Sequence, residues 1–193
     1  MPVITALRER ARGRVEIHLD GALWRTVPAD AVVRSDLRVG RPLDREAART
    51  LGRELRRAHA LGVAARALRY RDMSRQRLEA RLADRGAAGG ARAAALETLE
   101  RVGLVDDERV AVARAQALAG RGYGDAAIRL ALDGEGLEGE AVQAGLAELE
   151  PESERARGFL ERRGGGVKTL RWLAAHGFDA STLEDLGGFA EEG

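Results

Sequence analysis

Apolar and polar residues alternate between residues 14 and 20, which is the period of a half-buried strand. The apolar members are Val15, Ile17 and Leu19. The pair Asp20-Gly21 is typical of a tight hairpin turn, so residues 23–27 are predicted to return as a partner strand. With a further strand over residues 3–8, we expect a small antiparallel β-meander in an N-terminal module, residues 1–43.

Helical spacing replaces this alternation further along the chain. Pro28 to Val33 is predicted to form a short helix inside the N-terminal module. Asp44 is suited to capping a longer helix over residues 45–59, which belongs to a connecting segment, residues 44–60. Gly62 is expected to end that helix. A small sheet needs such a helix to pack against.

One short phrase occurs three times in the remaining sequence. It consists of an arginine, then after three residues a helix-starting residue, after eight more a leucine, and after four more a glycine. The copies are Arg71/Ser74/Leu82/Gly86, Arg121/Gly124/Leu132/Gly136 and Arg162/Gly165/Leu173/Gly177. In each copy the second residue is expected to cap a helix, the leucine to lie on its buried face and the glycine to end it.

Self-similarity of this kind indicates stacked helical units. We expect three helices in each unit and assign residues 61–104, 105–150 and 151–193 to the first, second and third units. The third is shorter, with an end prone to fraying. The expected fold is mainly α, with tandem three-helix repeats in an elongated, curved arrangement after the β-meander. The abundance of Ala, Leu, Arg and Glu supports a helical fold.

The composition narrows the possible chemistry. The chain has no cysteine, which excludes disulfides, thiolate metal sites and a cysteine nucleophile. Its first residues lack the order of an export signal, and no apolar run approaches the roughly 20 residues that span a bilayer. We therefore expect a cytoplasmic protein.

The polar residues give little support to an enzyme. His18, His59 and His176 share no spacing that suggests a common site. Asp106-Asp107 stands where a helix needs a cap and negative charge, so a structural role is favoured over metal binding. The glycine-rich stretches lack the lysine and hydroxyl ending of a phosphate-binding loop. We expect no catalysis, cofactor or metal.

Charge is distributed unevenly along the chain. Residues 1–90 hold 20 arginines and 11 acidic residues, or +9, whereas residues 91–193 hold 12 basic and 20 acidic residues, or −8. This asymmetry favours contact with a polyanion through one half and with a basic protein surface through the other. Compositional drift between two solvated surfaces is the alternative.

The most suggestive arginines lie in the first repeat unit. Arg77, Arg81 and Arg85 are spaced four apart and so share one helix face. Three more arginines precede them, namely Arg66, Arg69 and Arg71. Such a cluster is suited to gripping phosphates. An ordinary solvated helix face is the competing interpretation.

The repeats also carry a family resemblance. The most specific passage is Gly103-Leu-Val-Asp106-Asp107, which leads into a helix and is flanked by the first two copies of the phrase. Further matching residues are Ala67, Leu68, Tyr70, Met73, Leu78, Leu99, Ala111, Tyr123 and Ile128. Through these residues the range 60–150 resembles the RecX family, bacterial regulators of the RecA recombinase. The N-terminal meander, which ends in residues 37–44, is similar to an extension that some members carry.

The resemblance implies a regulator that lies along the RecA filament on single-stranded DNA. It would restrain ATP hydrolysis, strand exchange and filament growth. We expect Arg77, Arg81 and Arg85 to contact the polyanion. The repeated residues Arg71, Arg121 and Arg162 are weaker candidates, because repetition also preserves helix packing.

Two other functions remain open at this point. Three short helices with a glycine turn resemble helix-turn-helix units in outline, which suggests a general DNA-binding module. A protein-protein adaptor without a nucleic-acid role is the second alternative. In each case we expect a monomer.

Overall fold

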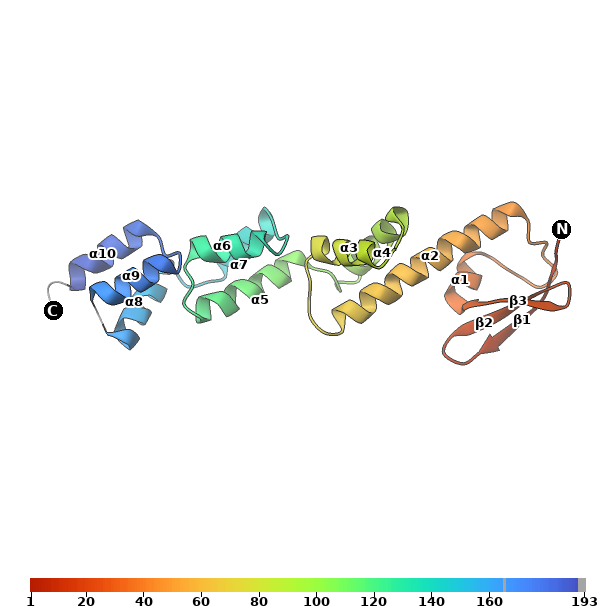
Figure 1. Ribbon diagram of the computed structural model, residues 1–193, viewed down its shortest axis with the longest axis horizontal. Coiled ribbons are helices and arrows are strands. Elements are labelled where there is room, and N and C mark those ends of the chain that lie inside the picture. The colour runs from red at the N-terminus through yellow and green to blue at the C-terminus, as the bar shows by residue number, and fades with distance from the viewer. Residues whose placement is uncertain (165, 191–193) are drawn as a thin grey trace. The chain divides into compact units, whose positions relative to one another are not determined.

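The computed structural model describes residues 1–164 and 166–190 (Figure 1). Within these ranges the chain forms ten helices and three strands. The predicted class, mainly helical with a small N-terminal antiparallel sheet, is confirmed. The residues form two compact units by their contacts, residues 1–71 with 78–102, and residues 72–77 with those from 103 onward. None of the helices described combines the length and apolarity needed to cross a membrane.

The first unit begins with the predicted meander. Strands β1 (Ile4–Arg10), β2 (Arg14–Leu19) and β3 (Ala22–Pro28) pair antiparallel in the order β1-β2-β3. Asp20 and Gly21 both have positive φ angles, of 49° and 87°, as a tight hairpin turn requires. This turn, which the sequence signals locally, pairs Leu19 with Ala22, and the register of the two strands then shifts at an irregularity between Ile17 and His18.

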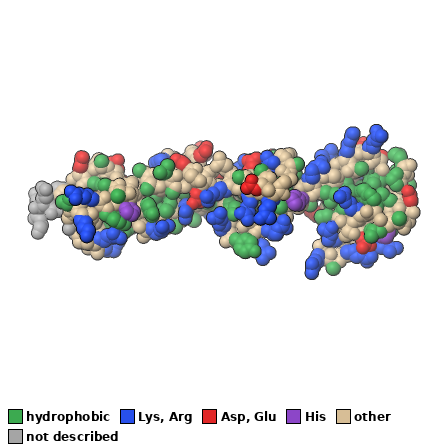
Figure 2. Space-filling model, viewed as in Figure 1, with side chains coloured by type: hydrophobic (Ala, Val, Ile, Leu, Met, Phe, Trp, Pro, Cys, Tyr) green, Lys and Arg blue, Asp and Glu red, His purple; other side chains and the backbone are tan. Residues whose placement is uncertain are grey.

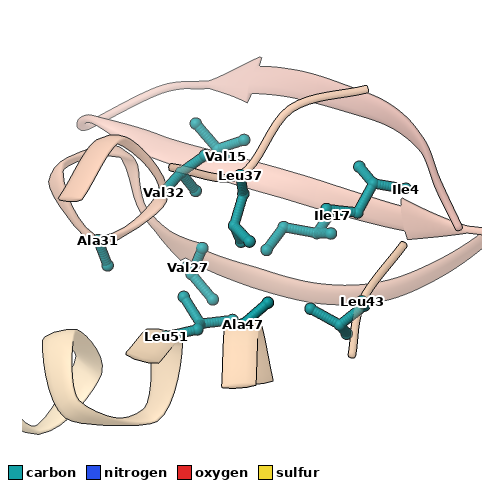
Figure 3. Close-up of a cluster of buried hydrophobic side chains, with 10 residues drawn as sticks. All are labelled: Ile4, Val15, Ile17, Val27, Ala31, Val32, Leu37, Leu43, Ala47 and Leu51. Carbon is teal, nitrogen blue, oxygen red and sulfur yellow. The ribbon is translucent and has the colours of Figure 1, made fainter. Parts of the chain in front are cut away.

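One face of the sheet is closed by helices. Figure 3 shows Val15, Ile17 and Val27 from the strands facing side chains from the start of α2 (Arg45–Leu68). Ala31 and Val32 of the short helix α1 (Ala29–Arg34) complete this core. A three-stranded sheet is marginal by itself, so its stability depends on the burial of these side chains.

Helix α2 corrects one sequence prediction. It runs without interruption from Arg45 to Leu68, so the break expected at Gly62 is wrong. Its buried side changes along its length: Ala47 and Leu51 face the sheet, whereas Val63 and its neighbours are buried on another side of the helix. Because of this change of side, the spacing of apolar residues in the sequence resembles that of two separate helices. The cost of a glycine inside a helix, about 1 kcal/mol, is offset by packing in both halves.

Helix α4 (Gly89–Arg101) and most of helix α3 (Arg75–Asp84) complete the first unit, whereas the first three residues of α3 belong to the second. Helix α3 contributes Leu82, which is fully buried, and α4 packs along α2. The Arg57 guanidinium of α2 donates a hydrogen bond of 3.0 Å to Thr98 Oγ1 of α4. Ser74 caps α3 as predicted, because its Oγ accepts a hydrogen bond from the Arg77 amide at 3.2 Å.

The second unit contains two groups of three helices. Helices α5 (Asp107–Gly120), α6 (Asp125–Asp133) and α7 (Glu140–Ala147) surround one apolar cluster that includes Ile128 and Leu132. Helices α8 (Glu152–Arg163), α9 (Val167–Ala175) and α10 (Ala180–Ala190) surround another that includes Leu173 and Phe178. The boundaries of the three repeat units stay a prediction.

The repeated leucine and glycine have the roles that the phrase predicts. Gly86, Gly136 and Gly177 have φ angles of 75°, 72° and 82°. The amide of the next residue bonds back to the carbonyl of the leucine five residues earlier in all three places. This is a Schellman turn, which ends each helix and directs the following side chain inward. The side chains so buried are Ala87, Leu137 and Phe178.

The start of the third phrase is less regular. Gly165, the expected capping residue, lies outside the described residues. Helix α9 has Gly166 at its N-cap position and begins at Val167. Thr169 is nevertheless buried, four residues after Gly165, where the first two copies bury Leu78 and Ile128.

Within the second unit, the glycine turn after α9 also docks on the start of α6. The amide of Gly124 donates to the His176 carbonyl at 2.9 Å, and the amide of Ala126 donates to the Gly177 carbonyl at 3.3 Å. A Cβ placed on Gly124 would lie 2.3 Å from the Gly177 carbonyl oxygen. The third helical group is therefore held to the second by direct backbone contact.

Replacing Gly124 with alanine tests this junction. Gly124 has an ordinary negative φ of −81°, so Gly124→Ala introduces a clash with the Gly177 backbone without a conformational penalty at residue 124. We expect a loss of about 2–3 kcal/mol in unfolding free energy, measured by urea denaturation followed by circular dichroism. Gly120→Ala is the matched control, because no atom lies within 4 Å of its added Cβ, and it should be neutral or stabilising. Equal effects of the two substitutions would contradict the close contact.

Candidate functional site

The structure places all eight candidate arginines on the surface. Arg66 lies in the last turn of α2, Arg69 follows directly as its C-cap residue, and Arg71 lies two residues beyond. Arg81 is in α3 and Arg85 follows its last residue. The other three lie in the second unit and are Arg77, Arg121 and Arg162.

Arg77 is engaged within the protein. Its Nη1 lies 3.4 Å from Glu135 Oε2, and the other oxygen of that carboxylate lies 2.8 Å from Arg114 Nε. Glu135 thus bridges two guanidinium groups beside the glycine turn at Gly136. Because a neighbouring carboxylate offsets its charge, Arg77 is a weaker phosphate ligand than its exposure alone suggests.

Arg121 and Arg162 each lie against an aromatic ring. The Arg121 guanidinium carbon is 5.5 Å from the centre of the Tyr123 ring, and that of Arg162 is 4.6 Å from the Phe159 ring. Both arginines lie at the C-terminal ends of helices, where a positive charge is stabilising. These contacts favour the packing role that repetition left open for them.

Four candidates keep their charge available. Arg66, Arg71, Arg81 and Arg85 are exposed and form no ion pair with any residue in the described ranges. Arg81 and Arg85 are one helical turn apart, so their side chains emerge on the same side of α3. They form the part of the candidate site that is best suited to a phosphate backbone.

Sequence reasoning overlooked Arg155, which is a buried connector in the second unit. Its Nε donates to the Glu150 carbonyl and its Nη1 to the Tyr123 carbonyl, each at 3.0 Å. Its Nη2 forms a short hydrogen bond with the Asp125 carboxylate. Two of these partners are 30 and 32 residues away in the chain, so no local pattern points to them.

Carboxylates at the starts of helices serve as caps. Asp106 accepts from the Arg109 amide at 2.9 Å, which confirms its predicted role at the start of α5. Asp107 accepts from the Arg75 amide at 2.7 Å and so caps α3 instead. Glu152 does the same for α6, accepting from the Asp125 amide at 2.6 Å.

The same end of α8 is tied to the loop before α10. The second Glu152 oxygen accepts from the Asp179 amide at 3.0 Å. The pKa of Asp179 is lowered because its carboxylate accepts hydrogen bonds from the Ser181 side chain and backbone. These hydrogen bonds fix the backbone at the starts of α6 and α10.

Among the residues described, no group of three or more His, Asp or Glu side chains is placed to hold a metal ion.

The histidines occupy unrelated environments. His18 Nε2, on β2, lies 3.7 Å from Glu16. His59 lies exposed on α2. His176 stacks on the Trp172 ring with the two ring centres 3.8 Å apart, and its Nδ1 is 2.7 Å from the Trp172 carbonyl oxygen. The ring of His176 therefore has a packing role beside the glycine turn.

Comparison with known proteins gives a consistent set of relatives. The regulatory protein RecX of Xanthomonas oryzae pv. oryzae is 36% identical over 134 residues, which cover 64% of this chain and 81% of the relative. The regulatory protein RecX of Stenotrophomonas maltophilia is 33% identical over 134 residues, covering 64% and 80%. No protein-family model matches the chain.

Solved structures share the fold. A crystal structure of a regulatory protein RecX aligns with a TM-score of 0.82 and 20% identity, covering 96% of this chain and 98% of that one. The crystal structure of RecX from Lactobacillus salivarius aligns with a TM-score of 0.59 and 16% identity, covering 68% and 94%. The first alignment includes nearly all of the chain.

Replacing Arg155 with alanine tests its role as a connector. Arg155→Ala would leave two carbonyls and the Asp125 carboxylate without their donor, and we expect a loss of about 3 kcal/mol in unfolding free energy. Arg157→Ala, two residues along the same helix and exposed, should change stability by less than about 0.5 kcal/mol. Urea denaturation of both variants measures the difference, and similar losses in the two would rule out a special role for Arg155.

Proposed function

This chain belongs to the RecX family of regulatory proteins, and we propose that it binds the RecA recombinase filament on single-stranded DNA and restrains its activity. The affected steps are ATP hydrolysis, strand exchange and filament growth. The identity of 36% over 81% of a regulatory protein RecX is the observation that carries this proposal. We expect the protein to act as a monomer in the cytoplasm.

The distribution of charge supports binding to a complex of nucleic acid and protein. Residues 1–90 have a net charge of +9 and residues 91–193 a net charge of −8. The basic part complements a phosphate backbone, and the acidic part complements a basic protein surface. A protein-coated DNA strand offers both surfaces to one ligand.

Among the candidate residues, Arg81 and Arg85 are the leading phosphate contacts. Their guanidinium groups are exposed and form no ion pair in the described part of the chain, so their charge is available to a phosphate. Arg66 and Arg71 are supporting candidates on the same grounds. Arg77, Arg121 and Arg162 contribute less to binding, because a carboxylate or an aromatic ring within the protein already contacts their guanidinium groups.

A recombinase ATPase assay tests the proposal. RecA hydrolyses ATP on single-stranded DNA, and substoichiometric amounts of this protein should lower the steady-state rate severalfold, because each bound copy blocks further growth of a filament. An unchanged rate and unchanged filament length would contradict the proposal. Binding to bare duplex DNA with no effect on the recombinase would indicate a general DNA-binding module instead.

Charge reversal at Arg81 and Arg85 tests the site. The double variant Arg81→Glu/Arg85→Glu should need at least about tenfold more protein for the same inhibition, because two attractive contacts become repulsive. Arg129→Glu/Arg157→Glu changes the net charge equally at two exposed arginines elsewhere and should inhibit like the parent. If both double variants inhibit normally, the role of these two arginines in binding is excluded, and the inhibition depends on contacts elsewhere on the protein.

A further inference from the structure

The first half of α2 carries a row of arginines that the candidate site does not include. Its members are Arg45, Arg49, Arg53 and Arg56, and we call them the α2 arginine row. Spacings of four, four and three residues place them on one face of the helix. Ala47 and Leu51 lie on the opposite face, buried against the sheet, so the row is directed to solvent and all four members are exposed.

The charge of this row is not balanced by neighbours. Arg45, Arg49 and Arg56 form no ion pair or side-chain hydrogen bond with any residue in the described ranges, and Arg53 donates only to Thr50 Oγ1, at 3.1 Å. Arg57 differs, because its Nη1 lies 3.9 Å from Glu54 Oε2 and its Nη2 donates a hydrogen bond to Thr98 Oγ1. The arginine that packs inside the unit is paired, whereas those of the row repel one another across the helix surface.

Small residues between the arginines leave a hollow. Ala48, Gly52 and three members of the row line a recess of about 450 Å³. A Cβ on Gly52 would lie 3.5 Å from Arg56 Nη1, so the guanidinium of Arg56 lies beside this gap. Figure 2 shows basic side chains gathered over the part of the molecule where Figure 1 places the first half of α2. A phosphate group can approach the helix here with guanidinium groups around it.

We propose that the α2 arginine row binds the sugar-phosphate backbone of duplex DNA, independently of base sequence and of the recombinase. The row spans about 16 Å, at 1.5 Å per residue, which is enough to face several phosphates of one duplex. A rigid helix holds the charges in a fixed line and matches the fixed phosphates of a duplex. The residues lining the recess include no aromatic ring on which an unpaired base could stack, which disfavours single strands.

Fluorescence anisotropy with a labelled duplex of 20 base pairs tests the proposal on the full chain. Contacts with four phosphates would give a slope of log affinity against log salt of about −3.6, at about 0.9 per contact. The variant Arg49→Gln/Arg56→Gln should reduce that slope by about 1.8 and weaken binding about 30-fold at 0.15 M salt. Arg49→Lys/Arg56→Lys keeps both charges and should keep most of the slope.

Arg129→Gln/Arg157→Gln is the matched control, because it removes the same charge from exposed positions elsewhere. The proposal is overturned if this control loses as much affinity, if Arg49→Gln/Arg56→Gln loses none, or if a single strand with the same number of phosphates competes equally well. Circular dichroism establishes that the variants are folded. Since the duplex assay contains no recombinase, its outcome is separate from that of the ATPase assay.

Discussion

The fold of the second unit depends on glycines that combine a left-handed backbone with the absence of a side chain. Gly177 ends α9 with a φ of 82°, and its carbonyl accepts the Ala126 amide of the preceding helical group. A Cβ there would lie 2.6 Å from the Cβ of Ala127. A Cβ on Gly136 would overlap the Gln76 side chain at the start of α3, although a flexible side chain relieves such an overlap more easily than backbone does. One small residue thus reverses the chain, directs an apolar side chain into the core and docks one helical group on another.

These junctions also decide which charges remain for binding. Asp107 caps the start of α3, Glu152 caps α6, Glu135 bridges two arginines, and Arg155 joins three backbone and side-chain acceptors. Such groups are committed to structure, so replacing them would change stability before it changed recognition. Arg81, Arg85 and the α2 arginine row form no ion pair in the described part of the chain, so their charge is the part that acts outward.

Local signals made much of this fold predictable from sequence, and distant contacts account for what was missed. The hairpin at Asp20-Gly21 and the caps at Asp44, Ser74 and Asp106 involve residues two or three positions apart. The unbroken α2 was missed because its buried side changes midway and a glycine follows. Arg155 was missed because its partners are distant in the chain, and the ion pair of Arg77 with Glu135 likewise joins residues from separate phrases. Spacing within one segment carries no information about such pairs.

The proposed function requires the protein to occupy the recombinase filament, and cosedimentation measures that occupancy most directly. The protein is mixed with single-stranded DNA, with or without saturating RecA and a slowly hydrolysed ATP analogue, and the pelleted amount is determined. The account predicts that pelleted protein rises in proportion to the RecA present and clearly exceeds the amount pelleted with the same DNA alone. Equal amounts with and without RecA would contradict it.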